Sequence, residues 1–262
     1  MIFRDKKVMG MGLLPLLVMM GLGVENIFAA DNAPQPVQVF AAASLRDGMT
    51  ETAADFEKEY GTKVELNFEG SNTLRLQIEK GAPCDVFISA DVDNAKRLAE
   101  EDLVVPDGRM EIMRNTLVVI GGLQETELSD LRGLAAASGY LSLADPETVP
   151  AGKYAKQALT TAGLWEILKD RIVPGVDVRA ALAQVEKGNA RFGIVYRTDA
   201  GISDEVRILY AIPESYHSPV TYVACLIRLQ PENLQAKSFF EFLKSAHVKT
   251  IFERYGFKPA YE

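Results

Sequence analysis

Hydrophobic and polar residues recur with two different periods along the chain, and each change of period marks a new element. Residues 37–40 alternate apolar and polar in the manner of a short strand. From Leu45 to Phe56 the apolar residues recur at helical spacing, and Gly61 follows as a helix stop. The pattern therefore predicts a strand and then a helix, with Ser44 as its N-cap.

The same unit of strand, small-residue turn and helix repeats along the chain. After the strands at residues 64–68 and 85–88, the segments Gly70-Ser71-Asn72 and Ser89-Ala90-Asp91 lead into further helices. More strands are predicted over residues 116–120, 140–144, 192–196, 206–212 and 220–227, and more helices over 150–162, 177–187, 231–243 and up to Tyr255. This order predicts an α/β fold with mixed, mostly parallel sheets flanked by helices, and ligands at the carboxyl ends of the strands.

Several predicted helices begin with residues that suit an anion. The first turn of a helix carries unpaired N–H donors and the positive end of the helix dipole. Ser44 and Ser71 add hydroxyl groups at two such starts. Pro150 suits a first helical position and leaves the next N–H to Ala151, while Asp177 is the predicted N-cap before Val178. Convergence of these starts predicts an anion-binding cleft rather than a catalytic centre.

The first thirty residues have a different composition from the rest. Arg4, Lys6 and Lys7 precede an apolar run over residues 8–24, and small residues follow at positions 29 and 30. We interpret residues 1–30 as a secretory signal peptide, with a retained membrane anchor as the alternative because Phe28 makes the cleavage site imperfect. Loss of its three basic and two acidic residues moves the net charge from −8 to −9. An acidic exported protein is a poor candidate for binding nucleic acid or an anionic membrane.

Metal and catalytic signatures are missing from the sequence. The two cysteines, Cys84 and Cys225, and the two histidines, His217 and His247, show no metal-ligand spacing. Each cysteine lies in or beside an apolar run, so two buried thiols and a disulfide both stay open. No nucleophile elbow or phosphate-binding loop occurs, and no base stands near Ser44 in sequence. The chain is therefore expected to bind a ligand rather than to act as an enzyme.

Several ordered motifs together resemble the periplasmic molybdate-binding proteins of ABC importers. The motifs are Ala41-Ala42-Ala43-Ser44-Leu45, Gly70-Ser71-Asn72-Thr73-Leu74, Gly81-Ala82-Pro83-Cys84-Asp85-Val86-Phe87-Ile88-Ser89-Ala90, Asp145-Pro146-Glu147, Val149-Pro150-Ala151-Gly152 and Gly193-Ile194-Val195-Tyr196. The similarity extends over the mature chain to Arg254-Tyr255-Gly256-Phe257. Any one motif is weak, but their order and separations make the resemblance specific.

The resemblance implies a two-lobed periplasmic binding protein fold of the class II type. Lobe 1 would comprise residues 31–113 plus 225–262, and lobe 2 residues 114–224. The ligand would be molybdate or tungstate, with no cofactor and no free metal cation. The implied partner is the membrane permease of an ABC importer, and the protein would be a periplasmic monomer.

The same resemblance implies the residues of the site. Ser44 and Ser71 would donate from lobe 1, Ala151 and Val178 would donate backbone N–H groups from lobe 2, and Tyr196 would donate its hydroxyl. A donor-only pocket suits this ligand, because a fully ionised oxyanion accepts hydrogen bonds and cannot donate them.

The roles of two charged residues are undecided from the sequence, and two alternative functions remain to be considered. Glu69 must point away from an anion pocket, and Arg179 either supplies countercharge or, as we favour, faces solvent or a carboxylate. A binding protein for sulfate, phosphate or an iron complex is one alternative. A secreted enzyme that uses Ser44 is the other.

Overall fold

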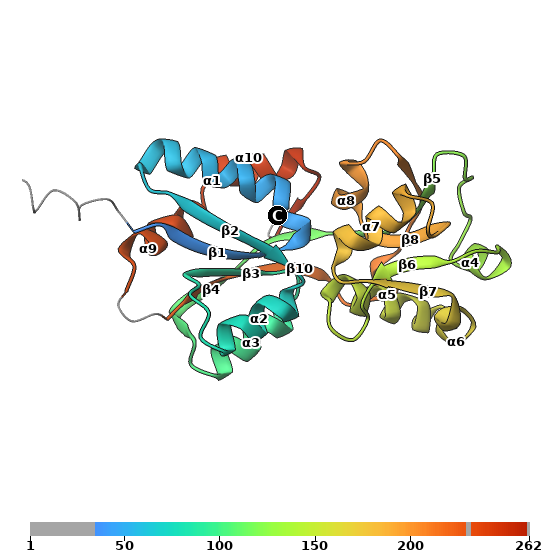
Figure 1. Ribbon diagram of the computed structural model, residues 1–262, viewed down its shortest axis with the longest axis horizontal. Coiled ribbons are helices and arrows are strands. Elements are labelled where there is room, and N and C mark those ends of the chain that lie inside the picture. Colours follow the sequence, from blue (N-terminus) through green and yellow to red (C-terminus); the bar gives the residue numbers. More distant parts are fainter. Residues whose placement is uncertain (1–34, 229–231, 261–262) are drawn as a thin grey trace, which may run out of the picture. The chain divides into compact units, whose positions relative to one another are not determined.

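The computed structural model describes residues 35–228 and 232–260, in which two β-sheets are flanked by helices (Figure 1). The predicted signal peptide lies outside the described residues. The strands are β1 Val37–Ala42, β2 Val64–Glu69, β3 Val86–Ser89, β4 Val104–Asn115, β5 Leu117–Gly122, β6 Leu141–Ala144, β7 Ile172–Gly175, β8 Phe192–Tyr196, β9 Val206–Ala211, β10 Val220–Ile227 and β11 Lys258–Pro259. The α-helices are α1 Arg46–Tyr60, α2 Ser71–Glu79, α3 Val92–Glu100, α4 Arg132–Ala136, α5 Pro150–Thr161, α6 Trp165–Leu168, α7 Val178–Glu186, α8 Arg197–Gly201, α9 Leu234–Phe242 and α10 Ala246–Arg254. The 3-10 helices are η1 Ala43–Leu45, η2 Lys169–Arg171 and η3 Glu214–Tyr216.

The strand orders show where parallel pairing is used. The first sheet has the order β11-β4-β10-β3-β1-β2, and the second has the order β7-β6-β8-β5-β9. In the first sheet β1 pairs in parallel with β2 and β3, and in the second β6 pairs in parallel with β7 and β8. The other pairs are antiparallel. The sheets are mixed, as predicted, but antiparallel pairs are more frequent than expected.

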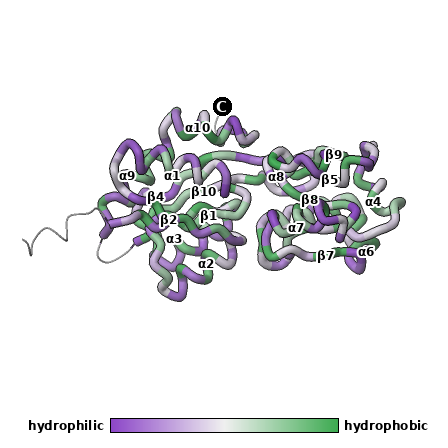
Figure 2. Tube along the Cα trace, turned by 45° about the horizontal axis from the view of Figure 1, so that its top comes forward, coloured by the Kyte–Doolittle hydropathy of each residue, from purple (hydrophilic) through white to green (hydrophobic). Residues whose placement is uncertain are grey.

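The hydrophobic core lies on both faces of the sheets. In the first sheet, Val39 of β1 belongs to the same buried cluster as Phe56 of α1 and Phe252 of α10. On the opposite face, Phe87 of β3 belongs to a second cluster with Leu98 of α3. Figure 1 shows α1 and α10 on one side of this sheet and α2 and α3 on the other, and Figure 2 shows hydrophobic stretches along the strands. Burial on both faces explains why strands such as residues 117–120 are continuously apolar.

Three strands absent from the sequence prediction complete the sheets, namely β4, β7 and the two-residue β11. β4 carries Pro106, Asp107 and Gly108 within its length, and its buried positions follow no simple period. β7 contains Pro174 and lies at the edge of the second sheet, where a missing N–H breaks no ladder. None of the three segments has the regular alternation by which a strand is recognised in a sequence, and β11 is too short to show one.

The prediction that Ser44 is an N-cap is wrong. Ser44 lies inside η1, a short 3-10 helix that joins β1 to α1, and α1 has no side-chain cap at its start. The Ser44 hydroxyl instead forms a buried hydrogen bond with the Tyr222 hydroxyl. The predicted cap at Asp177 is confirmed, because its carboxylate accepts from the Ala180 N–H, and Asp91 caps α3 in the same way by accepting from the Asn94 N–H.

Candidate functional site

A small cavity lies where the carboxyl ends of β1, β2 and β3 meet the starts of α5 and α7. The five residues predicted to bind a ligand all line it, namely Ser44, Ser71, Ala151, Val178 and Tyr196. The other lining residues are Ala42, Ala43, Glu69, Gly70, Ala90, Val149, Pro150 and Asp177. Residues attached to both sheets therefore surround one space.

The volume and walls of the cavity limit what it can hold. About 10 Å³ is open to the centre of a water-sized sphere, which leaves no room for an extended organic ligand in this arrangement. Gly70 lets the two sides approach closely, because an added Cβ would lie 3.2 Å from a methyl group of Val149 and 3.4 Å from the carbonyl oxygen of Val176. A small ion suits this space.

Helices α5 and α7 of the second sheet both begin at the cavity, and the first turn of a helix carries backbone N–H donors. Pro150 is the first residue of α5, so Ala151 carries the next N–H of an unpaired first turn. In α7 the Asp177 carboxylate accepts from the Ala180 N–H, which leaves the Val178 N–H outside this cap. Both helix starts also bring the positive ends of their dipoles to the cavity.

Tyr196 brings a hydroxyl group whose hydrogen-bonding capacity is unused. The residue ends β8, is 1% exposed and lines the cavity. Its hydroxyl oxygen is buried and has no hydrogen-bond partner among the described residues. Burial raises the pKa of Tyr196 well above its usual value, so the group keeps its proton and can donate. A buried donor without a partner is costly unless a ligand accepts its hydrogen bond.

The two serines differ in what holds them. The Ser71 hydroxyl accepts a hydrogen bond of 3.0 Å from the Ala90 N–H, so its own hydrogen stays available to the cavity. The Ser44 hydroxyl lies 2.8 Å from the Tyr222 hydroxyl. Both serines are buried.

Arg179 does not provide a free positive charge. Its guanidinium forms ion pairs with Asp199 at 2.5 Å and with Asp47 at 2.6 Å, and it donates to the Ser44 carbonyl at 3.3 Å. Burial lowers the pKa of Arg179, but the charges of Asp199 and Asp47 raise it further, so the net shift is upward. The expectation that Arg179 faces a carboxylate is therefore confirmed. An anion in the cavity would be held by neutral donors.

Sequence reasoning missed four residues next to the site: Asp47, Asp199, Asn115 and Tyr222. The two acids hold Arg179, and Asn115 and Tyr222 are hydrogen-bonded to each other beside Ser44. Each comes from a different element from its partner, and no local motif marks any of them. Glu69, whose carboxylate an anion site requires to turn outward, is half-buried and lines the cavity.

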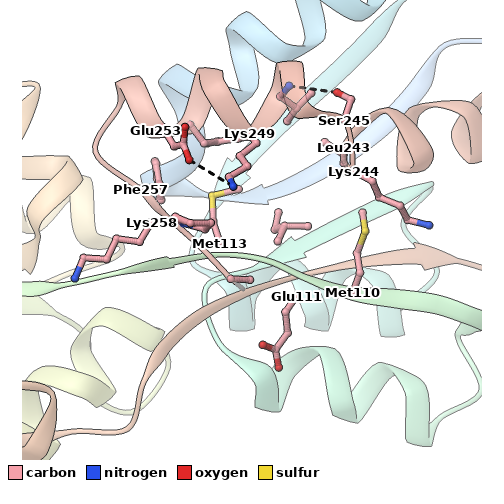
Figure 3. Close-up of a pocket in the computed structure, with 15 residues that line it drawn as sticks. Met110, Glu111, Met113, Leu243, Lys244, Ser245, Lys249, Glu253, Phe257 and Lys258 are labelled. Atoms are coloured by element: carbon pink, nitrogen blue, oxygen red, sulfur yellow. Dashed lines mark hydrogen bonds and ion pairs between the residues drawn. The ribbon is translucent and has the colours of Figure 1, made fainter. Parts of the chain in front are cut away.

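A larger hollow, of about 320 Å³, lies away from these residues between β4, α10 and β11 (Figure 3). Its wall includes Met110 and Met113 of β4, Lys249 of α10, and Phe257 and Lys258 near the C-terminal end. None of the predicted site residues lines it. In the described part of the chain, no group of three or more His, Cys, Asp and Glu residues is placed to hold a metal ion.

Two mixed sheets with helix starts and hydroxyl donors around one small cavity are typical of a binding protein for a small solute. A family profile described as "Bacterial extracellular solute-binding protein" matches residues 37–258. The chain is 38% identical over 247 residues to the Molybdate-binding protein ModA of Haemophilus influenzae, with 92% of this chain and 95% of the relative covered. It is 39% identical over 227 residues to the protein of the same name from Escherichia coli strain K12, with 84% and 88% covered.

A solved structure agrees with these matches. The periplasmic molybdate-binding protein of Azotobacter vinelandii superposes with a TM-score of 0.76 at 25% identity, covering 84% of this chain and 98% of the other. The chain therefore belongs to the bacterial extracellular solute-binding proteins, among the ModA members of that family.

Proposed function

We propose that the protein binds molybdate, and also tungstate, in the periplasm and delivers it to the membrane permease of an ABC importer. The observation that carries this proposal is that the five predicted binding residues line one small cavity, with the Tyr196 hydroxyl buried there without a partner among the described residues. The names of the relatives support the ligand and, for the Azotobacter vinelandii protein, the periplasmic location.

The donor set fits a doubly charged tetrahedral oxyanion. Ser44, Ser71 and Tyr196 would each donate a hydroxyl hydrogen, and Ala151 and Val178 would each donate a backbone N–H. Hydrogen bonds to a charged acceptor contribute about 1.5–3 kcal/mol each, so five neutral donors can hold an anion without a lysine or arginine. This set of five donors disfavours an anion that keeps a proton, because none of the five groups would accept a hydrogen bond from it.

Binding would join the two sheets through the ligand. Ser44 and Ser71 follow β1 and β2 of the first sheet, whereas Ala151, Val178 and Tyr196 belong to elements of the second. An anion that contacts both sets favours the arrangement in which the sets lie close together. That arrangement is the form that we expect the permease to accept. Among the helices of residues 35–228 and 232–260, none combines the length and the apolar composition that a membrane span requires.

Calorimetric titration tests the proposal. The purified protein without residues 1–30, freed of bound anion, is titrated with molybdate, tungstate, sulfate and phosphate. We expect tight one-to-one binding of molybdate and tungstate, and binding at least about 10-fold weaker in both Ser44→Ala and Tyr196→Phe. Equal or tighter binding of sulfate or phosphate would overturn the ligand assignment. Unchanged affinity in both variants would overturn the site.

A further inference from the structure

A buried chain of side-chain hydrogen bonds ends at Ser44. Asn115 is the last residue of β4, Tyr222 lies in β10, and both are buried. The Asn115 amide nitrogen lies 3.3 Å from the Tyr222 hydroxyl, which in turn lies 2.8 Å from the Ser44 hydroxyl. The ligand contacts proposed above do not include Asn115 or Tyr222.

The orientation of the Asn115 amide follows from its neighbour. The backbone N–H of Thr116 donates to the Asn115 Oδ1 at 2.9 Å. A backbone N–H can only donate, so the atom facing it must be the oxygen. The amide nitrogen is therefore turned toward the Thr198 hydroxyl, at 2.8 Å, and toward the Tyr222 hydroxyl.

This orientation determines where the Tyr222 hydrogen goes. Its oxygen accepts from Asn115, and the Tyr222 side chain is 0% exposed, so bulk water does not compete for the hydroxyl. Burial raises the pKa of Tyr222, which keeps the hydroxyl protonated. The acceptor within reach of its hydrogen is the Ser44 Oγ. Ser44 accepts this bond, and its own hydrogen is left for the cavity.

The same result is reached at Ser71 by a different route. There the backbone N–H of Ala90 donates to the hydroxyl oxygen, which also leaves the serine hydrogen free. One serine is oriented by the backbone and the other by side chains. Conservative substitutions can alter the hydrogen bonds of Asn115 and Tyr222, whereas only a proline would remove the Ala90 N–H.

We propose that Asn115 and Tyr222 are positioning residues that make the Ser44 hydroxyl an obligate hydrogen-bond donor, so that the site prefers a fully deprotonated oxyanion to a protonated one. The inference rests on the proposed function and adds to it the residues that set this preference. Without the hydrogen bonds from Asn115 to Tyr222 and from Tyr222 to Ser44, the Ser44 hydroxyl could rotate and accept a hydrogen bond from a protonated ligand.

The test is a double-mutant cycle on Ser44 and Tyr222, with molybdate and phosphate titrated at pH 7, where phosphate still carries a proton. We expect Tyr222→Phe to weaken molybdate binding about 10-fold. In a Ser44→Ala background, the same change should weaken it by less than about 2-fold, because Tyr222 acts through Ser44. The ratio of phosphate affinity to molybdate affinity should rise in Tyr222→Phe.

A second variant, Asn115→Asp, keeps the side-chain shape but reverses the direction of the hydrogen bonds that link residue 115 to Tyr222 and Ser44. A carboxylate would accept from Tyr222, so Ser44 would donate to Tyr222 and turn a lone pair toward the cavity. The ratio of phosphate affinity to molybdate affinity should rise here as well. Added negative charge alone would weaken the binding of both anions. Tyr210→Phe, at a half-buried tyrosine of β9 outside the cavity, is the matched control and should change neither affinity.

Additive losses in the cycle, or an unchanged ratio in both variants, would overturn the inference. Thermal unfolding of each variant without anion separates these results from a loss of fold. If the unmodified protein failed to bind molybdate, that result would instead overturn the proposed function itself. The two failures are therefore distinguishable.

Discussion

The guanidinium of Arg179 reaches from the first turn of α7 to the carboxylate of Asp47 in the first turn of α1, at 2.6 Å. α1 flanks the first sheet and α7 packs on strands of the second. The contact thus joins the two sheets beside Ser44, whose carbonyl accepts from the same guanidinium. Asp199, whose side chain is 0% exposed, holds Arg179 from its other side.

Asp47→Asn should weaken molybdate binding about 2- to 5-fold. An anion with donors on both sheets favours the arrangement in which they lie together, and Arg179–Asp47 is a contact of that arrangement. The Asp47 side chain is 37% exposed, so the loss should be that of a partly screened pair, about 0.4–1 kcal/mol. Calorimetric titration at two salt concentrations measures it, and the difference from the unmodified protein should shrink at high salt.

Asp55→Asn is the control for this prediction. Asp55 lies on the same helix and pairs with His247 at 2.7 Å, outside the cavity. Its loss should leave molybdate affinity unchanged. A similar weakening in both variants would mean that the charge of α1 matters, and not the contact with Arg179.

Asp199 should make stability depend on pH between about 4 and about 6. Burial raises its pKa from 3.8 to about 6, against the opposing effect of Arg179. Between these pH values the folded protein therefore holds a proton on Asp199 that the unfolded chain has released. The contribution of Asp199 to the free energy of unfolding falls as pH rises from about 4 to about 6, and it is constant above about pH 6. In urea unfolding at several pH values, the stability of the unmodified protein relative to Asp199→Asn should decrease from pH 4 to pH 6. A stability difference between the two proteins that stays constant or increases over this range would contradict the raised pKa of Asp199.

Gly152→Ala should destabilise the protein by about 3 kcal/mol or more. An added Cβ would lie 2.1 Å from the carbonyl oxygen of Ala144 and 2.4 Å from that of Asp145, and backbone atoms cannot turn away. Helix α5 would have to move, and the Ala151 N–H with it. Urea unfolding measures the loss. Gly201→Ala is the control, because its Cβ would meet no atom within 4 Å and should cost little.

Cys84 and Cys225 should react with iodoacetamide after unfolding and hardly at all before. The structure has both as free, buried thiols, which settles the alternatives that the sequence left open. Burial raises the pKa of Cys225 to about 12 and that of Cys84 well above its usual value, so little reactive thiolate forms at neutral pH. Mass spectrometry without reductant should find two adducts on the unfolded chain. A disulfide would leave none.

The sequence predicts those parts of the fold that depend on local patterns. Asp177 caps the helix assigned to it, because a cap needs only a side chain and an N–H three residues away. The strand–helix junctions place Ser71, Ala151 and Val178 at helix starts, and the structure gathers them with Ser44 and Tyr196 around one cavity. Their contacts with an anion, like the lobe boundaries, stay predictions.

The parts that the sequence missed depend on partners far along the chain. Ser44 has the residue type of an N-cap, yet its hydroxyl is bound to Tyr222, 178 residues later. Arg179 meets Asp47 across 132 residues. β4 is a strand because β10 and β11 pair with its two edges, although its own sequence has no strand period. Such pairings are set by the tertiary fold and leave no trace in neighbouring residues.

The junction between the sheets shows how the chain is constructed. Asn115 at the end of β4 pairs directly with Val220 at the start of β10, in antiparallel register. Two such strands need only a tight turn between them, but residues 116–219, with the whole second sheet, stand in that position. Strands β4 and β10 of the first sheet are thus arranged as a β-hairpin whose turn has been replaced by the second sheet. Cutting out residues 116–219 and closing the gap with an Asn-Gly turn would leave every strand pairing of the first sheet in place.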